Sequence, residues 1–190
     1  MNLSLILASK SPRRKALLEQ LGYSFSCISA DVDESIFFAE NAEKYVLRVA
    51  TAKAQVIAQQ NINAVVLGAD TSVIVDGNIL TKPVDFVDSK RMLTLLSGRQ
   101  HQVLTALAII YKQQINSVIV STDVFFKPLS AVEISDYWHS GEPQDKAGSY
   151  AIQGLAGKFV THIQGSYSAV VGLPLYETEQ LLEKYSFVKI

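Results

Sequence analysis

One carboxylate, Asp70, stands in the middle of an apolar stretch that runs from Val65 to Val75. A run that is apolar on both faces is typical of a central strand that is covered on each side. A carboxylate is unfavourable in such a strand unless it is paired with a cation or bound to a metal ion. Asp70 is therefore a candidate catalytic or metal-binding residue. An aspartate bonded to a neighbouring loop is the structural alternative.

Four cations are available to an anionic ligand: Arg13, Arg14, Lys53 and Lys82. Helical spacing places Lys53 on the inward face of a helix expected over residues 40–60, where it needs an anion nearby. Snorkelling of its stem to solvent is equally compatible with this spacing. Glu34 could give a hard cation a second oxygen ligand, although a solvated acidic loop is the simpler interpretation of residues 31–34.

The first phosphate-binding candidate lies between residues 5 and 22, which read as a buried strand, a small polar loop and a helix. Ser11 is a preferred N-cap, and Pro12 suits the first helical position. A helix N-terminus presents free backbone N–H groups, and here the hydroxyls of Ser9 and Ser11 and two arginines join them. This composition predicts an anion site. A capped helix with solvated arginines remains the alternative.

Several familiar chemistries are absent from the sequence. It has no P-loop, no G-x-G-x-x-G, no cysteine–histidine zinc spacing and no G-x-S-x-G nucleophile elbow. The three histidines are scattered and are interpreted as structural or surface residues, and the net charge of -1 argues against a nucleic-acid binder. What remains is a carboxylate ringed by cations, which is the arrangement expected for phosphoryl or nucleotidyl transfer.

The hydrophobic pattern predicts a mixed α/β or α+β fold with two lobes about a cleft, in one domain over residues 1–190. Strands are expected over 24–29, 65–75, 79–81, 102–111, 115–126 and 159–163, and helices over 40–60, 87–96, 130–138 and 174–185. Residues 165–167 read as a turn, and the polar segment 141–150 is expected to stay outside the core. Cys27 is expected to be a buried structural thiol.

The sequence also indicates where in the cell the protein is expected. No apolar run reaches the roughly 20 residues that span a bilayer, and the N-terminus lacks the pattern of a signal peptide. We therefore expect a soluble cytoplasmic protein without membrane or nucleic-acid partners.

Taken in order, the motifs resemble the Maf family of nucleoside triphosphate pyrophosphatases, over nearly the whole chain. The matching pieces are Ala8-Ser9-Lys10-Ser11-Pro12-Arg13-Arg14, Asp33-Glu34, the Lys53 helix, Gly68-Ala69-Asp70-Thr71, Leu80-Thr81-Lys82-Pro83, residues 96–101, residues 145–154 and residues 165–174. The resemblance implies a fold related to the inosine triphosphatase type, with a central mixed sheet, flanking helices and the active site in the cleft between lobes. It also implies a homodimer.

The same resemblance implies hydrolysis of a nucleoside triphosphate to the monophosphate and pyrophosphate, with a divalent cation such as Mg²⁺ or Mn²⁺. Arg13, Thr71 and Gln153 look like the set associated with dTTP, UTP and modified pyrimidine nucleotides. A second subgroup, which acts on 7-methyl-GTP, carries other residues at these positions. A glutamine side chain both donates and accepts, which suits the adjacent N–H and carbonyl of uracil or thymine.

We therefore expect Asp70 to act as general base, metal ligand or both, directing water at the α-phosphorus. Glu34 would help to hold the metal. The triphosphate would be bound by Ser9, Arg14, Lys53 and Lys82. The rival interpretations are a non-catalytic nucleotide-binding regulator of cell division, and the same chemistry on 7-methyl-GTP or another purine nucleotide.

Overall fold

The computed structural model describes residues 3–185 and residue 187. Their strands are β1 (Ser4–Leu7), β2 (Phe25–Cys27), β3 (Ala64–Val75), β4 (Asn78–Leu80), β5 (Gln100–Tyr111), β6 (Gln114–Phe126) and β7 (Val160–Gln164). Their α-helices are α1 (Pro12–Glu19), α2 (Ala42–Gln60), α3 (Phe86–Leu96), α4 (Ala131–His139), α5 (Tyr167–Val171) and α6 (Leu175–Leu182). Short 3-10 helices cover Glu142–Asp145, Ala147–Ser149 and Leu155–Phe159. Within this described part, no helix combines the length and apolarity that a membrane span needs.

The strands form one mixed sheet in the order β2-β1-β3-β5-β6-β7, and β4 also pairs with β3. The pairs β1–β2 and β1–β3 are parallel, and the remaining pairs are antiparallel. On one edge of β3, β1 covers residues 64–67 and β4 covers residues 73–75. Residues 68–72 lie between these two partners, so the sheet is open on that edge at the level of Asp70.

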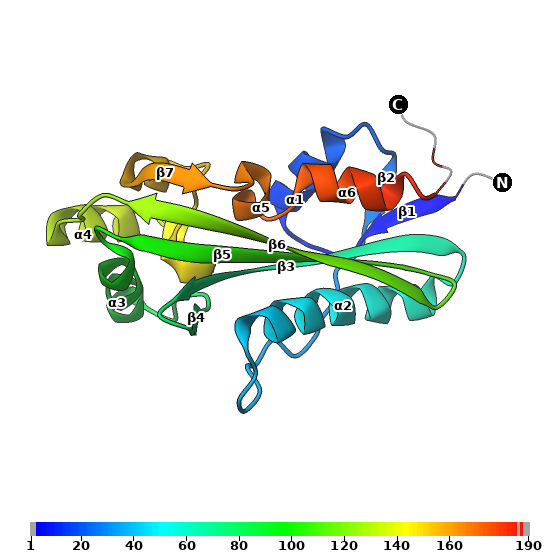
Figure 1. The fold of residues 1–190 in the computed structure, drawn as a ribbon, viewed down its shortest axis with the longest axis horizontal. Coiled ribbons are helices and arrows are strands. Elements are labelled where there is room, and N and C mark those ends of the chain that lie inside the picture. Colours follow the sequence, from blue (N-terminus) through cyan, green and yellow to red (C-terminus); the bar gives the residue numbers. More distant parts are fainter. Residues whose placement is uncertain (1–2, 186, 188–190) are drawn as a thin grey trace.

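Helices cover both faces of the three long strands (Figure 1). Because strand side chains alternate, Val66 joins the core beneath α2, whereas Leu67 joins the core that includes residues of α1 and α6. Gly68 faces α2 at close range: a Cβ there would overlap the Ala50 carbonyl oxygen and lie 2.8 Å from Ala54 N. The missing side chain therefore lets the helix lie directly against β3.

The structure confirms the mixed α/β class, the central strand over 65–75, the long helix before it and the antiparallel hairpin of β5 and β6. Ser11 caps α1 with Pro12 in its first turn, and Ser130 with Glu133 forms a capping box on α4. The observed ends of these elements agree with the expected ones to within three residues. The C-terminal helix, expected over 174–185, is α6 and ends at Leu182.

Two expectations were wrong. Cys27 is exposed, because β2 is a short strand at the edge of the sheet. The segment 141–150 contributes to the core, since Tyr150 packs on Phe126 and Ser149 is fully buried. The turn expected over 165–167 is present at Gly165 and Ser166, and Tyr167 already begins the short helix α5, which Ser166 caps through its hydroxyl.

Candidate active site

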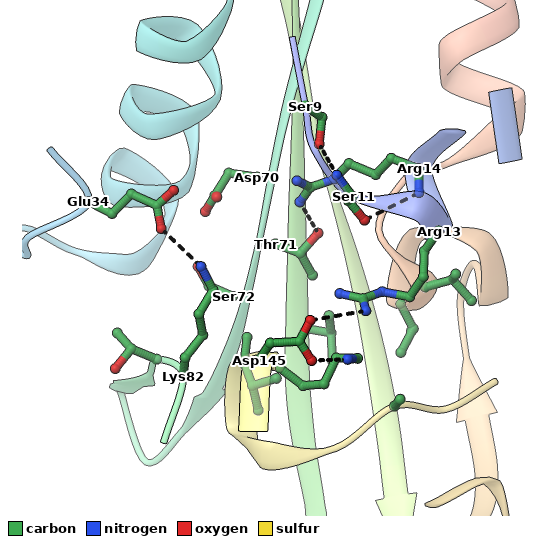
Figure 2. Close-up of a pocket in the computed structure, with 18 of the residues that line it drawn as sticks. Ser9, Ser11, Arg13, Arg14, Glu34, Asp70, Thr71, Ser72, Lys82 and Asp145 are labelled. Carbon is green, nitrogen blue, oxygen red and sulfur yellow. Dashed lines mark hydrogen bonds and ion pairs between the residues drawn. The ribbon is translucent and has the colours of Figure 1, made fainter. Parts of the chain in front are cut away.

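A cleft of about 740 Å³ opens beside the uncovered edge of β3. Its walls come from the β1–α1 loop, the loop before α2, the centre of β3, the loop after β4 and the segment from Asp145 to Gln153. Every site residue expected from the sequence lines this cleft: Ser9, Arg13, Arg14, Glu34, Lys53, Asp70, Thr71, Lys82 and Gln153. Figure 2 shows how several of them converge from separate elements.

Asp70 and Lys53 form a buried ion pair at the inner wall. Lys53 Nζ donates to Asp70 Oδ1 at 2.8 Å, and both residues are less than one tenth exposed. The close approach of α2 over Gly68 makes this pairing geometrically available. Burial raises the pKa of Asp70 above its ordinary value, and the charges of Lys53 and Arg14 oppose that rise.

Glu34 completes a chain of alternating charges. Its Oε1 lies 2.7 Å from Lys53 Nζ, and its Oε2 lies 3.5 Å from Lys82 Nζ. Partial burial raises the pKa of Glu34, but hydrogen bonds and charge from the two lysines outweigh it, so the net shift is downward. The hydroxyl of Tyr45 donates to the Glu34 carbonyl oxygen at 2.9 Å and so ties this loop to α2. Glu34 is thus held at the cleft and is not a freely solvated loop residue.

Arg14 lies on the opposite wall, next to Thr71. Arg14 Nε donates to the Gly172 carbonyl oxygen at 2.9 Å, and Nη2 donates to Thr71 Oγ1 at 3.3 Å. Burial lowers the pKa of this guanidinium, with Asp70 acting in the opposite direction. Two fixed hydrogen bonds orient the group and leave further N–H donors for an anion.

The β1–α1 loop is shaped by its serines. The Ser11 N–H donates to Ser9 Oγ at 3.1 Å, and the Arg14 N–H donates to Ser11 Oγ at 3.4 Å. Ser9 is buried at the floor of the cleft. The loop therefore presents hydroxyls and the start of α1 to the same space as Asp70.

Arg13 and Gln153 belong to the outer part of the cleft. Arg13 Nη1 lies 4.0 Å from Asp145 Oδ2, and Asp145 also pairs with Lys146. Gln153 is exposed at the rim. These two residues come from α1 and from the segment after Tyr150, whereas Lys53 and Asp70 come from α2 and β3.

The contributors to the cleft that sequence reasoning missed include Tyr45, Asp145 and Lys146. Tyr45 lies two helical turns before Lys53 on the same stripe of α2, and this spacing could have identified it. Asp145 and Lys146 open a motif that was recognised, but no local pattern ties them to Arg13.

Carboxylates that could hold a divalent cation are few. Asp70 and Glu34 both point at Lys53 Nζ and are hard oxygen donors. Across residues 3–185 and 187, no group of three or more His, Cys, Asp or Glu side chains is arranged to hold a metal ion.

Comparison with known proteins identifies the family of this chain. The family model described as "Maf-like protein" matches residues 4–185. A Vibrio parahaemolyticus protein named "dTTP/UTP pyrophosphatase" is 57% identical over 185 residues, which cover 97% of this chain and 98% of that protein. A Pseudoalteromonas atlantica protein of the same name is 55% identical over 186 residues, covering 96% and 97% of the two chains.

Among solved structures, the Ham1 protein of Staphylococcus aureus matches with a TM-score of 0.45 and 13% identity, over 65% of this chain and 71% of that chain. A likeness this low carries no argument about function. The family model matches nearly the whole described chain, and the relatives named above are more than half identical to it. The chain therefore belongs to the Maf family.

Proposed function

We propose that this protein hydrolyses dTTP, UTP and modified pyrimidine nucleoside triphosphates to the monophosphate and pyrophosphate. The observation that carries the proposal is the buried Asp70–Lys53 pair at the floor of a cationic cleft. The names of the relatives at 57% and 55% identity support this activity on dTTP and UTP.

The charge balance of the cleft suits a triphosphate. Six cationic side chains line it, against three carboxylates. The cations are Lys10, Arg13, Arg14, Lys53, Lys82 and Lys146, and the carboxylates are Glu34, Asp70 and Asp145. A surplus of positive charge in a concave site attracts a polyanion and stabilises the charge that develops on a leaving pyrophosphate.

In the proposed reaction, the Asp70 carboxylate accepts a proton from water as the water oxygen attacks the α-phosphorus. The bond between the α-phosphorus and the oxygen that bridges to the β-phosphorus breaks, and pyrophosphate leaves with that electron pair. Arg14, Lys53 and Lys82 would bind the phosphates, together with the hydroxyl of Ser9. Their placement around Asp70 supports these roles.

A divalent cation, Mg²⁺ or Mn²⁺, fits the donor set at Asp70 and Glu34. Both carboxylates already converge on one positive charge, that of Lys53. Mg²⁺ is usually bound by one or two carboxylates together with substrate phosphates, so a larger protein cage is not needed. When bound, such an ion would neutralise phosphate charge and polarise the reacting phosphoryl group.

Nucleotide choice is assigned to Arg13, Thr71 and Gln153. Gln153 at the rim has both a donor and an acceptor, as the imide edge of uracil or thymine does. Arg13 and Thr71 line the same cleft on the side of α1 and β3. We also propose that the chain acts as one domain, because β3, β5 and β6 run without interruption behind the cleft.

The test is a nucleotide panel with Mg²⁺ or Mn²⁺ and a pyrophosphate readout. The proposal predicts release from dTTP and UTP, with much weaker release from 7-methyl-GTP and ITP. Release from 7-methyl-GTP or ITP alone would reject the specificity. Binding without pyrophosphate release from any nucleotide would reject the enzyme in favour of a nucleotide-binding regulator.

A further inference from the structure

A buried hydroxyl behind the cleft, that of Thr105, contacts the hydroxyl of Thr71. Thr105 lies directly opposite Thr71 in the β3–β5 ladder and is fully buried. Its Oγ1 lies 2.7 Å from the Ala169 carbonyl oxygen and 3.0 Å from Thr71 Oγ1. Thr71 Oγ1 in turn lies 3.3 Å from Arg14 Nη2.

The direction of every hydrogen bond in this chain follows from its two ends. The Ala169 carbonyl can only accept, so the single hydroxyl hydrogen of Thr105 points at it. Thr105 must then accept from Thr71, whose own hydrogen is thereby committed. Arg14 can only donate, so it takes one lone pair of Thr71 Oγ1. Thr71 Oγ1 therefore has one lone pair left to accept a hydrogen bond from a ligand, and it has no hydrogen left to donate.

We infer that Thr71 acts on the nucleotide as a hydrogen-bond acceptor only, and that Thr105 is the positioning residue that fixes this polarity. The inference rests on the proposed function, in which Thr71 helps to choose the nucleotide. The ligand group that it selects is a donor on the nucleoside. dTTP and UTP share two such donors, the 3′-hydroxyl of the sugar and the N3–H of the base.

The chain of hydrogen bonds is fixed from outside the cleft, so ligand binding does not reset it. Arg14 Nε donates to the Gly172 carbonyl oxygen, three residues after Ala169. Both ends of this series of hydrogen bonds are therefore held by backbone carbonyl groups, that of Ala169 in α5 and that of Gly172, which follows α5. Reversing the Thr71 hydroxyl would leave two oxygens facing each other without a hydrogen at a buried position, which is unfavourable.

The experiment measures the dissociation constants of non-hydrolysable α,β-methylene dTTP and of its 3′-deoxy and N3-methyl derivatives. The wild-type protein is expected to bind the derivative that lacks the donor facing Thr71 about tenfold more weakly than the parent nucleotide, as the loss of one hydrogen bond predicts. Because Gln153 also faces the imide edge in the proposed function, the donor is identified as the group whose loss no longer weakens binding in Thr71→Val. Thr71→Val should bind that derivative and the parent nucleotide almost equally. Equal binding of all three by the wild-type protein would overturn the inference.

Thr105 is tested through its own series. Thr105→Val keeps the side-chain shape but frees the Thr71 hydrogen, so the tenfold preference should fall to about threefold or less. Thr105→Ser restores the hydroxyl and should restore the preference. The matched control is Thr178→Val, which removes a buried hydroxyl that donates to the Pro174 carbonyl oxygen at 2.7 Å on α6.

Thr178→Val should keep the wild-type preference, whereas a full preference in Thr105→Val would overturn the positioning role. Pyrophosphate release from dTTP is measured separately. If the protein releases pyrophosphate but binds the parent nucleotide and both derivatives equally, only this inference is rejected. If it distinguishes the derivatives but releases no pyrophosphate, only the proposed function is rejected.

Discussion

Lys53 Nζ lies 2.8 Å from Asp70 Oδ1, with both side chains about 11% exposed. A buried pair of this kind is a weak source of stability as a unit, but removing Lys53 leaves Asp70 as a buried charge without its ion-pair partner, whereas removing Asp70 leaves Lys53 paired with Glu34. The pair therefore links the chemistry of the cleft to the packing of α2 on β3.

We predict that Lys53→Met lowers the free energy of unfolding by about 3 kcal/mol, because it leaves Asp70 buried without its cation. The same change in an Asp70→Asn background should have a much smaller effect. Denaturant unfolding of the two single variants and the double variant gives the coupling energy. Lys82→Met is the control, since the Lys82 side chain is 61% exposed and its loss should change stability little. Additive effects of the Lys53 and Asp70 changes would contradict the account.

Gly68 should tolerate no side chain. In Gly68→Ala, the new Cβ would overlap the backbone of α2, so the helix must move away from β3 and the protein should lose about 3 kcal/mol of stability. The comparison is Gly77→Ala, where φ is +75° but no atom lies within 4 Å of the added Cβ. That variant should lose only about 1 kcal/mol, the cost of the left-handed backbone. Thermal unfolding of both variants measures the difference, and equal losses would refute the packing argument.

His101 should make the protein less stable in acid. Its Nε2 lies 2.8 Å from the Tyr150 hydroxyl and its Nδ1 has no hydrogen-bond partner within the described residues. Burial, together with the charge of Arg99, lowers the pKa of His101 to about 4. The unfolded chain, with a pKa near 6.5, therefore binds the proton first as the pH falls.

Stability should therefore be full above about pH 6.5 and fall by about 3 kcal/mol down to about pH 4. His101→Gln keeps an acceptor for Tyr150 but does not titrate, so its unfolding free energy should lose this part of the pH dependence. Urea unfolding at a series of pH values gives both curves. Parallel curves for the two proteins would show that His101 is not the source.

Local sequence rules were sufficient for the elements that carry the inner wall. The apolar run around Asp70 and the helical spacing of Lys53 predicted a strand and an inward-facing lysine, and the two side chains do meet. Capping chemistry likewise located the start of α1, because Ser11 and Pro12 act within one turn. These features depend on contacts between near neighbours or on a single periodicity.

The parts that could not be predicted depend on pairings between distant segments. Arg14 contacts Gly172 across 158 positions of sequence, and Thr71 meets Thr105 only because of the register between β3 and β5. Burial of Tyr150 likewise comes from aromatic packing on His101 and Phe126, which overrides the polar composition of its segment. A single sequence has no local signal for such contacts.

In the proposed reaction Asp70 accepts the proton from water, and Asp70→Asn removes its carboxylate with little change in shape. The amide is nearly isosteric, so the fold should survive, but it cannot act as a base and is a poor metal ligand. Asp123→Asn is the control, since Asp123 lies on β6 outside the cleft. Pyrophosphate release from dTTP with Mg²⁺ should fall by about 10²–10⁴-fold in Asp70→Asn and stay unchanged in Asp123→Asn. Turnover of dTTP at the wild-type rate by a folded Asp70→Asn protein would contradict the account.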